Sequence, residues 1–137
     1  MQQYTLNEDI NVICQTVGSF PSGIKEAFEA LIANFGMAGR EFYGISYLDE
    51  ECGIIYKVAV SAFVDNEELK PGYEEFTIRK GNYLTETLKN WMAKTDKIKD
   101  IFGLLMEDPR YDNSSPCVEW YKNDGEMLCM VKSKPLN

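Results

Sequence analysis

The chain carries Ile24-Lys25-Glu26-Ala27-Phe28 in its first half, and the pattern returns in the second half as Ile98-Lys99-Asp100-Ile101-Phe102. Leu31-Ile32 follows the first copy and Leu105-Met106 follows the second. Both copies therefore place apolar residues at positions i, i+3, i+4, i+7 and i+8, the spacing of an amphipathic helix that buries one side. A helix that occurs twice predicts a chain built from two repeated halves.

Segments with strand character precede both helices. Residues 10–17 come before the first helix, and residues 83–91 come before the second. Alternation rich in threonine favours a strand in the second segment. Its leucines also fit the spacing of a helix, but the repeat argues against a helix there. In that strand Leu84 and Leu88 share one face, and the other face carries Tyr83, Thr85, Thr87 and Trp91.

A β-hairpin is predicted after each helix. The turn of the second hairpin is Asn123-Asp124-Gly125, a strong turn signal. Residues 54–58 and 127–131 match at nearly the same offset as the two helices. The predicted hairpin strands are residues 41–48 and 53–64 around an acidic turn at 49–52, and residues 117–122 and 126–133.

These elements predict an α+β fold. It consists of two tandem, pseudo-symmetric β-α-β-β units, with an antiparallel sheet, the helices on one side and a ligand groove between the halves. We expect one domain over residues 1–137, with repeats at about 8–64 and 74–134. A connector at 65–72 and a short strand near 76–79 join the two units.

The amino-acid composition argues against several classes of function. A formal net charge of −8, with 14 basic residues scattered among 22 acidic ones, argues against direct binding of nucleic acid. The chain has no histidine, which excludes Ser-His-Asp and Cys-His catalysis, and its four cysteines show no C-x-x-C spacing for zinc. No leader and no apolar run of membrane length is visible, so we expect a cytoplasmic protein with reduced thiols, no cofactor and no membrane contact.

Short motifs in the second half occur in a fixed order: Gly81-Asn82-Tyr83, Asp108-Pro109-Arg110-Tyr111-Asp112, Pro116-Cys117-Val118-Glu119-Trp120-Tyr121 and Asp124-Gly125-Glu126. In these motifs, and in overall layout, the chain resembles the GyrI-like (gyrase-inhibitor-like) effector-binding domains. Such domains also form the ligand-binding halves of bacterial multidrug-responsive transcription activators. The resemblance implies binding of bulky, flat, often cationic compounds between aromatic walls, with Glu119 as the acid at the base of the groove.

Two further expectations follow from the resemblance. Some relatives are fused to helix-turn-helix regions, for which this chain has no room, so it looks like a stand-alone version. A subset of stand-alone relatives hydrolyses strained, cyclopropane-bearing compounds.

Glu119 is the central candidate residue. Strand alternation places Cys117, Glu119 and Tyr121 on one face, and Val118 and Trp120 on the other. We expect the apolar pair to face the helix, which turns Glu119 into the groove. A carboxylate among aromatic rings should have a raised pKa. The alternative is a surface glutamate on an exposed sheet face.

Four aromatic residues are candidate ligand contacts. Tyr121 would place a phenol beside Glu119, and Trp91 at the groove mouth would stack on a flat or cationic ligand. Tyr83 and Phe42 are candidates only because strand alternation places them on the same face as the groove. For each of the four, a purely structural role remains the alternative.

Three functions are compatible with these residues. The first is a stand-alone module that binds apolar, perhaps cationic, organic ligands in transcriptional regulation or in resistance to a drug or toxin. The second is a cofactor-independent hydrolase of strained electrophiles, with Glu119 as acid or base and Tyr121 as proton donor. The third is contact with a macromolecule, such as a topoisomerase or a separate DNA-binding subunit, for which the sequence offers no motif.

Overall fold

The structure is a computed structural model that describes residues 1–18, 23–51, 53–63, 69–123 and 125–135. Both predicted helices and both predicted hairpins are confirmed. Parts of the predicted turns, strand end and connector, at residues 52, 64–68 and 124, lie outside the described residues. The elements are β1 (Gln2–Leu6), β2 (Ile10–Thr16), α1 (Ile24–Phe35), β3 (Phe42–Asp49), β4 (Gly53–Ser61), β5 (Glu74–Ile78), β6 (Gly81–Lys89), the short 3₁₀ helix η1 (Trp91–Ala93), α2 (Thr95–Glu107), β7 (Cys117–Asn123) and β8 (Glu126–Lys132).

All eight strands form one antiparallel sheet in the order β1-β6-β8-β7-β3-β4-β2-β5. The order is symmetric, because β3-β4-β2 in the first half corresponds to β7-β8-β6 in the second. A pseudo-two-fold axis therefore passes between β3 and β7, which pair along the seam of the two halves. The predicted fold class, α+β with tandem pseudo-symmetric halves, is confirmed.

Each half contains one more strand than the predicted β-α-β-β unit, so the halves are β-β-α-β-β. The additional strand of each half pairs with the other half. β1 lies beside β6, and β5 lies beside β2. Polar and apolar residues in β1 alternate over only four positions, Gln3 to Leu6, a pattern too short to predict a strand by itself.

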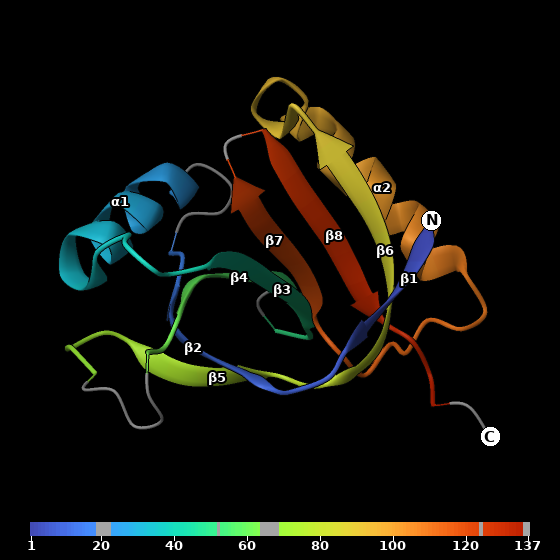
Figure 1. Ribbon diagram of the computed structural model, residues 1–137, viewed down its shortest axis with the longest axis horizontal. Coiled ribbons are helices and arrows are strands. Elements are labelled where there is room, and N and C mark those ends of the chain that lie inside the picture. Colours follow the sequence, from blue (N-terminus) through green and yellow to red (C-terminus); the bar gives the residue numbers. More distant parts are fainter. Residues whose placement is uncertain (19–22, 52, 64–68, 124, 136–137) are drawn as a thin grey trace.

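The sheet curls, and its two faces have different partners (Figure 1). On the face that we call the helix face, α1 packs over β2 and β4, and α2 packs over β6 and β8. The opposite, inner face is enclosed by the curl of the sheet and has its own apolar cluster. Its buried members come from seven strands, β2 to β8: Val12, Cys14, Tyr43, Ile45, Ala59, Ile78, Tyr83, Val118, Leu128 and Met130.

The helices are held by the apolar stripes that the repeat predicts. Leu31 in α1 and Leu105 in α2 are almost completely buried. Burial of a leucine side chain contributes about 1.5–3 kcal/mol. α1 ends at Gly36, whose φ of 82° lies in the left-handed region, and α2 ends two residues before Pro109. Among the described residues, no helix is both long and apolar enough to cross a membrane.

Candidate functional site

Glu119 lies on the helix face at the seam of the two halves. In β7 it stands between Gly44 of β3 and Cys129 of β8, its partners on the two neighbouring strands. A Cβ atom at Gly44 would lie 2.5 Å from Glu119 Oε1 and would also collide with the hydroxyl of Tyr56. The glycine therefore provides the space that the carboxylate and the phenol occupy.

Two phenols hydrogen-bond to one oxygen of this carboxylate. Tyr56 Oη in β4 donates to Glu119 Oε1 at 2.6 Å, and Tyr121 Oη donates to the same atom. The two hydroxyl oxygens are 3.1 Å apart. Among the described residues none donates a hydrogen bond to Oε2, so the second carboxylate oxygen retains its capacity to accept one.

Burial dominates the electrostatics of the three groups. Only 8% of Glu119 is exposed, and loss of hydration raises the pKa of its carboxyl, while the hydrogen bonds from Tyr121 and Tyr56 act in the opposite direction. Burial and the adjacent Glu119 charge raise the pKa of both phenols well above their ordinary value. Both tyrosines are therefore protonated donors at neutral pH.

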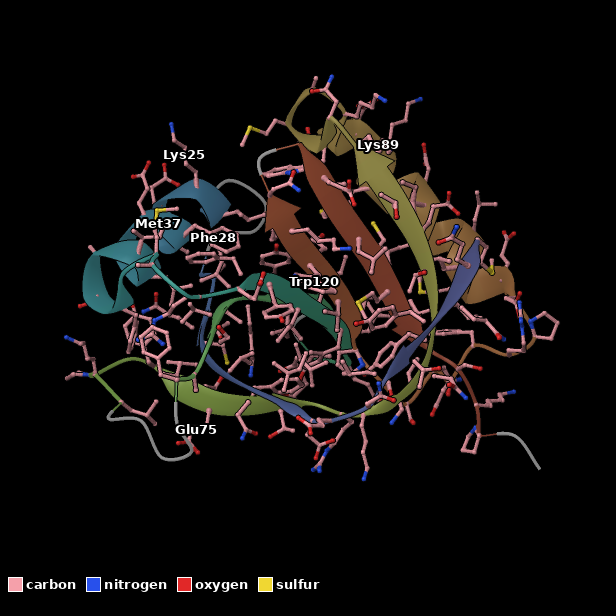
Figure 2. All side chains as sticks on the ribbon, viewed as in Figure 1. Lys25, Phe28, Met37, Glu75, Lys89 and Trp120 are labelled. Atoms are coloured by element: carbon pink, nitrogen blue, oxygen red, sulfur yellow. The ribbon has the colours of Figure 1, made fainter. Side chains whose placement is uncertain are left out.

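A row of aromatic rings crosses the seam beside the carboxylate. Phe28 of α1 contacts Tyr121 edge-on with ring centroids 5.4 Å apart, and Trp91 of η1 contacts the same ring with centroids 4.9 Å apart. Phe28 lies on the side of α1 that faces the seam strands (Figure 2). Phe42 stands directly opposite Tyr121 in the β3–β7 ladder. The row joins the first half to the second over Glu119.

The structure brings together four of the five candidate residues, namely Glu119, Tyr121, Trp91 and Phe42. Tyr83 is not among them. It is buried in the inner-face cluster, and its hydroxyl donates to the carbonyl of Arg79 at 2.5 Å. Strand parity alone had grouped Tyr83 with Trp91, but β6 ends at Lys89 and the chain turns through Asn90, whose φ is 56°.

Because of that turn, Trp91 lies on the helix face with Leu84 and Leu88, not opposite them as predicted. Its indole Nε1 donates to the carbonyl of Asn123 at 3.2 Å, which fixes η1 against the β7–β8 hairpin.

The predicted orientation of β7 was wrong in one respect. Val118 and Trp120 face the inner cluster and not a helix, and Trp120 stacks on Tyr43 there at 6.2 Å. Glu119 and Tyr121 therefore occupy the helix face, between the two helices. The prediction assumed one apolar sheet face, whereas the curl of the sheet creates two.

Three residues of the site were missed from the sequence: Tyr56, Phe28 and Gly44. Alternation in β4 places Tyr56 on the face of Val58 and Val60, and a phenol within such an apolar row was the available signal. Phe28 was taken only as part of the helix stripe. Nothing in the sequence distinguishes Gly44 from a glycine that merely interrupts a strand.

The described part of the chain offers no metal site and no reactive cysteine. No group of three or more His, Cys, Asp or Glu there is arranged to hold a metal ion. Cys14, Cys117 and Cys129 are free, and burial raises the pKa of Cys129 to about 12. The arrangement offers instead a buried acceptor oxygen, two proton donors and apolar rings.

No protein-family model and no curated protein matches the sequence. Solved structures do match the fold. An integron cassette protein from Vibrio cholerae shares 14% identity and superimposes with a TM-score of 0.71, over 97% of this chain and 95% of that one. SAV2435 bound to tetraphenylphosphonium has a TM-score of 0.63 at 14% identity, over 97% and 93% of the two chains. A hydrolase from Listeria innocua has a TM-score of 0.61 at 10% identity, over 97% and 90%.

These structures are similar to the chain over nearly their whole length. At such low identity the similarity concerns the fold and leaves activity open. The chain has the GyrI-like fold, which is shared by ligand-binding proteins and by small hydrolases.

Proposed function

We propose that the protein binds bulky, apolar organic cations on the helix face, at the seam between its two halves. The observation that carries the proposal is the Glu119 carboxylate, which lies mostly buried among rings while its Oε2 accepts no described hydrogen bond and, since no fully buried side-chain oxygen there lacks a partner, remains in reach of a ligand. A buried negative charge is costly unless it is paired, and a cation without strong hydration is the partner that best fits an apolar surrounding.

The aromatic row supplies the second part of the site. The faces of Trp91 and Tyr121 attract a positive charge through their quadrupoles, by about 1–2 kcal/mol where the cation is desolvated. Phe28 and Phe42 add apolar area. The complex of SAV2435 with tetraphenylphosphonium supports this ligand class, because a protein with a similar fold binds this aromatic cation.

Entry of a ligand requires the rings to separate. Trp91 contacts Tyr121 at 4.9 Å in this structure, and Phe28 contacts the same ring. Trp91 belongs to a single 3₁₀ turn, which is held to the β7–β8 hairpin by the indole hydrogen bond and by the backbone hydrogen bond from Asn90 to Gly125, whereas α1 is a helix of 12 residues. We therefore expect η1 to move more than α1 when a ligand binds. Binding of this kind would serve to sense or sequester a drug or toxin.

The test compares tetraphenylphosphonium with the neutral triphenylphosphine oxide by isothermal titration calorimetry. Glu119→Gln should weaken the cation at least tenfold and the neutral compound less than twofold, because only the cation depends on the charge. Glu126→Gln removes a charge from the adjacent strand and should change neither. Equal losses for both compounds in Glu119→Gln would refute the anchoring role of the carboxylate.

A second candidate function is hydrolysis of a strained electrophile such as an activated cyclopropane. It is favoured by the two protonated phenols on one carboxylate oxygen, and a Listeria innocua hydrolase shares the fold. In this reaction Glu119 accepts a proton from water as the water oxygen bonds to a ring carbon. The carbon–carbon bond breaks, Tyr121 donates a proton to the departing carbon, and Glu119 returns a proton to Tyr121. The net change is addition of one water.

Turnover distinguishes catalysis from binding. Purified protein at one hundredth of the substrate concentration should convert an activated cyclopropane completely, and Glu119→Gln should reduce the rate by 10²–10⁴-fold, the usual contribution of general acid–base catalysis. Protection limited to one equivalent of substrate per protein would exclude the hydrolase.

A further inference from the structure

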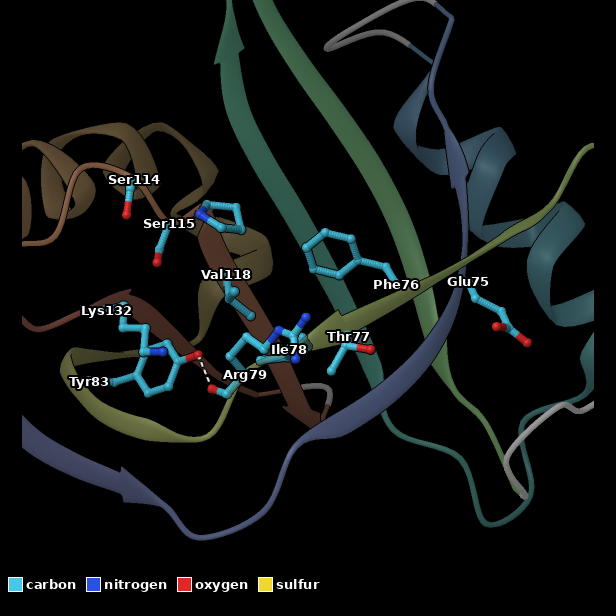
Figure 3. Close-up of a pocket in the computed structure, with 11 residues that line it drawn as sticks. Glu75, Phe76, Thr77, Ile78, Arg79, Tyr83, Ser114, Ser115, Val118 and Lys132 are labelled. Carbon is cyan, nitrogen blue, oxygen red and sulfur yellow. Dashed lines mark hydrogen bonds between the residues drawn. The ribbon is translucent and has the colours of Figure 1, made fainter.

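A cavity of about 530 Å³ lies on the inner face, away from Glu119 (Figure 3). This volume is within the range of small-molecule sites, about 300–1,000 Å³. Its apolar wall consists of inner-face residues, among them Phe76, Tyr83 and Val118. On the other side it is bounded by the loop at 114–116.

Two cationic side chains line this cavity, Lys132 and Arg79. Lys132 ends a row of inward-facing residues in β8, after Leu128 and Met130. β8 is a central strand, between β6 and β7, so this lysine does not protect a sheet edge. The described residues give Lys132 no ion pair. Lys132 is half-buried, and its charge helps to lower the pKa of Asp112, but without an ion pair its ammonium can still bind an anion in the cavity.

Arg79 retains donors for such an anion. Its one described ion pair, with Asp9, is long at 3.9 Å, and Asp9 already accepts a hydrogen bond from the Lys80 backbone at 2.8 Å. The backbone at Arg79 is fixed, because its carbonyl accepts the hydroxyl of Tyr83. The guanidinium has five N–H donors, and one weak pair leaves most of them unused.

Asp112, whose pKa the charge of Lys132 helps to lower, forms no ion pair with Lys132 among the described residues. Asp112 Oδ1 accepts hydrogen bonds from the backbone and the hydroxyl of Ser114, at 3.0 and 2.6 Å, and so shapes the loop that forms the wall. Glu75 lies at the far end and points away from Lys132 and Arg79 (Figure 3). The cavity is therefore cationic in a chain whose net charge is −8.

We propose that this inner-face cavity is a second ligand site, for an organic anion with a carboxylate or sulfonate on an apolar body. The anion is held between Lys132 and Arg79, and the body lies against Phe76, Tyr83 and Val118. The site is independent of the cation site proposed above, since the two lie on opposite faces of the sheet.

The test uses decanoate and decyltrimethylammonium, two probes with the same alkyl chain and opposite charge, titrated calorimetrically below their micellar concentrations. Decanoate should bind the wild type, and the double variant Lys132→Gln/Arg79→Gln should weaken it at least tenfold, since each charged hydrogen bond is worth about that factor. The matched double variant Lys89→Gln/Lys97→Gln removes the same charge from exposed positions and should stay within twofold.

Location is tested by two further variants. Ser115→Trp adds a ring at the cavity wall and should abolish decanoate binding while circular dichroism shows an intact fold. Glu119→Gln should leave decanoate binding unchanged. No binding of decanoate to the wild type, equal losses in both lysine-containing double variants, or loss in Glu119→Gln would each overturn the proposal.

Discussion

The two faces of β7 have different chemistry. On the helix face, Glu119 and Tyr121 form a buried polar group closed by Tyr56. On the inner face, Val118 and Trp120 pack among apolar residues, and the cationic Lys132 and Arg79 line the cavity there. One strand therefore separates an acidic interior from a cationic opening. A sheet with both faces enclosed can carry two chemistries that do not neutralise each other.

The largest expected effect is a loss of stability on the helix face, where the side chains of Tyr56 and Glu119 leave no space for a Cβ at Gly44. Gly44→Ala should lower the free energy of unfolding by about 1–3 kcal/mol, because its Cβ collides with Tyr56 and Glu119. Gly103→Ala in α2 is the control, since nothing lies within 4 Å of its Cβ and alanine favours a helix. Urea unfolding measures the free energy of unfolding of the two variants. Similar stabilities for the two variants would show that the carboxylate and phenol are not fixed by Gly44.

A second prediction concerns the buried acid. The folded-state pKa of Glu119 is raised, so in the pH range above the ordinary value of 4.5 the native state retains a proton that the unfolded chain has released. The stability contributed by this group therefore falls as the pH rises through that range. Glu119→Gln should be more stable than the wild type at neutral pH, and the difference should shrink as the pH falls towards 4.5. A difference independent of pH would contradict this account.

A third prediction compares one tyrosine from each face. Tyr56→Phe and Tyr83→Phe should each cost about 1 kcal/mol, because each loses one hydrogen bond of a buried phenol. Only Tyr56→Phe should alter the pH dependence, since its hydroxyl stabilises the ionised form of Glu119. Urea midpoints at pH 5 and pH 8 separate the two. An equal pH response in both variants would mean that Tyr56 does not act on the carboxylate.

The smallest effect is expected on the inner face. Lys132→Met should change the stability of the ligand-free protein by no more than about 0.5 kcal/mol, because the lysine has no ion pair to lose among the described residues. Thermal melts with and without decanoate check this. A large loss of stability without ligand would assign Lys132 a structural role.

The sequence predicted the fold well because its strongest signals are local and occur twice. The helix stripes around Leu31 and Leu105 and the two hairpins follow from periodicity and turn residues. β1 was missed because its place depends on β6, a pairing that joins Gln2 to Thr85. Such distant contacts leave no local trace.

The site was predicted where strand parity sufficed and missed where the chain turns or the faces had to be assigned. Alternation along β7 placed Glu119 and Tyr121 on one face, and the pairing of β3 with β7 puts Phe42 opposite Tyr121. Trp91 and Tyr83 lie on different faces of the sheet because the backbone turns at Asn90, which has a left-handed conformation. Strand alternation cannot predict such a turn. Tyr56 enters from the other half through the seam, and only the three-dimensional pairing of β3 with β7 reveals it.

The exchange of β1 and β5 between the halves means that neither half contains all of its own sheet. A fragment with only the first half would lose the strand that borders β2 and would expose an unpaired edge prone to aggregation. The two halves must therefore assemble in one cooperative step, late and slowly, since ordering β1 requires closure of a loop that spans most of the chain. Two identical copies of a single β-β-α-β-β unit could complete the same sheet by reciprocal exchange, which makes a strand-swapped homodimer a physically complete ancestor of the duplicated chain.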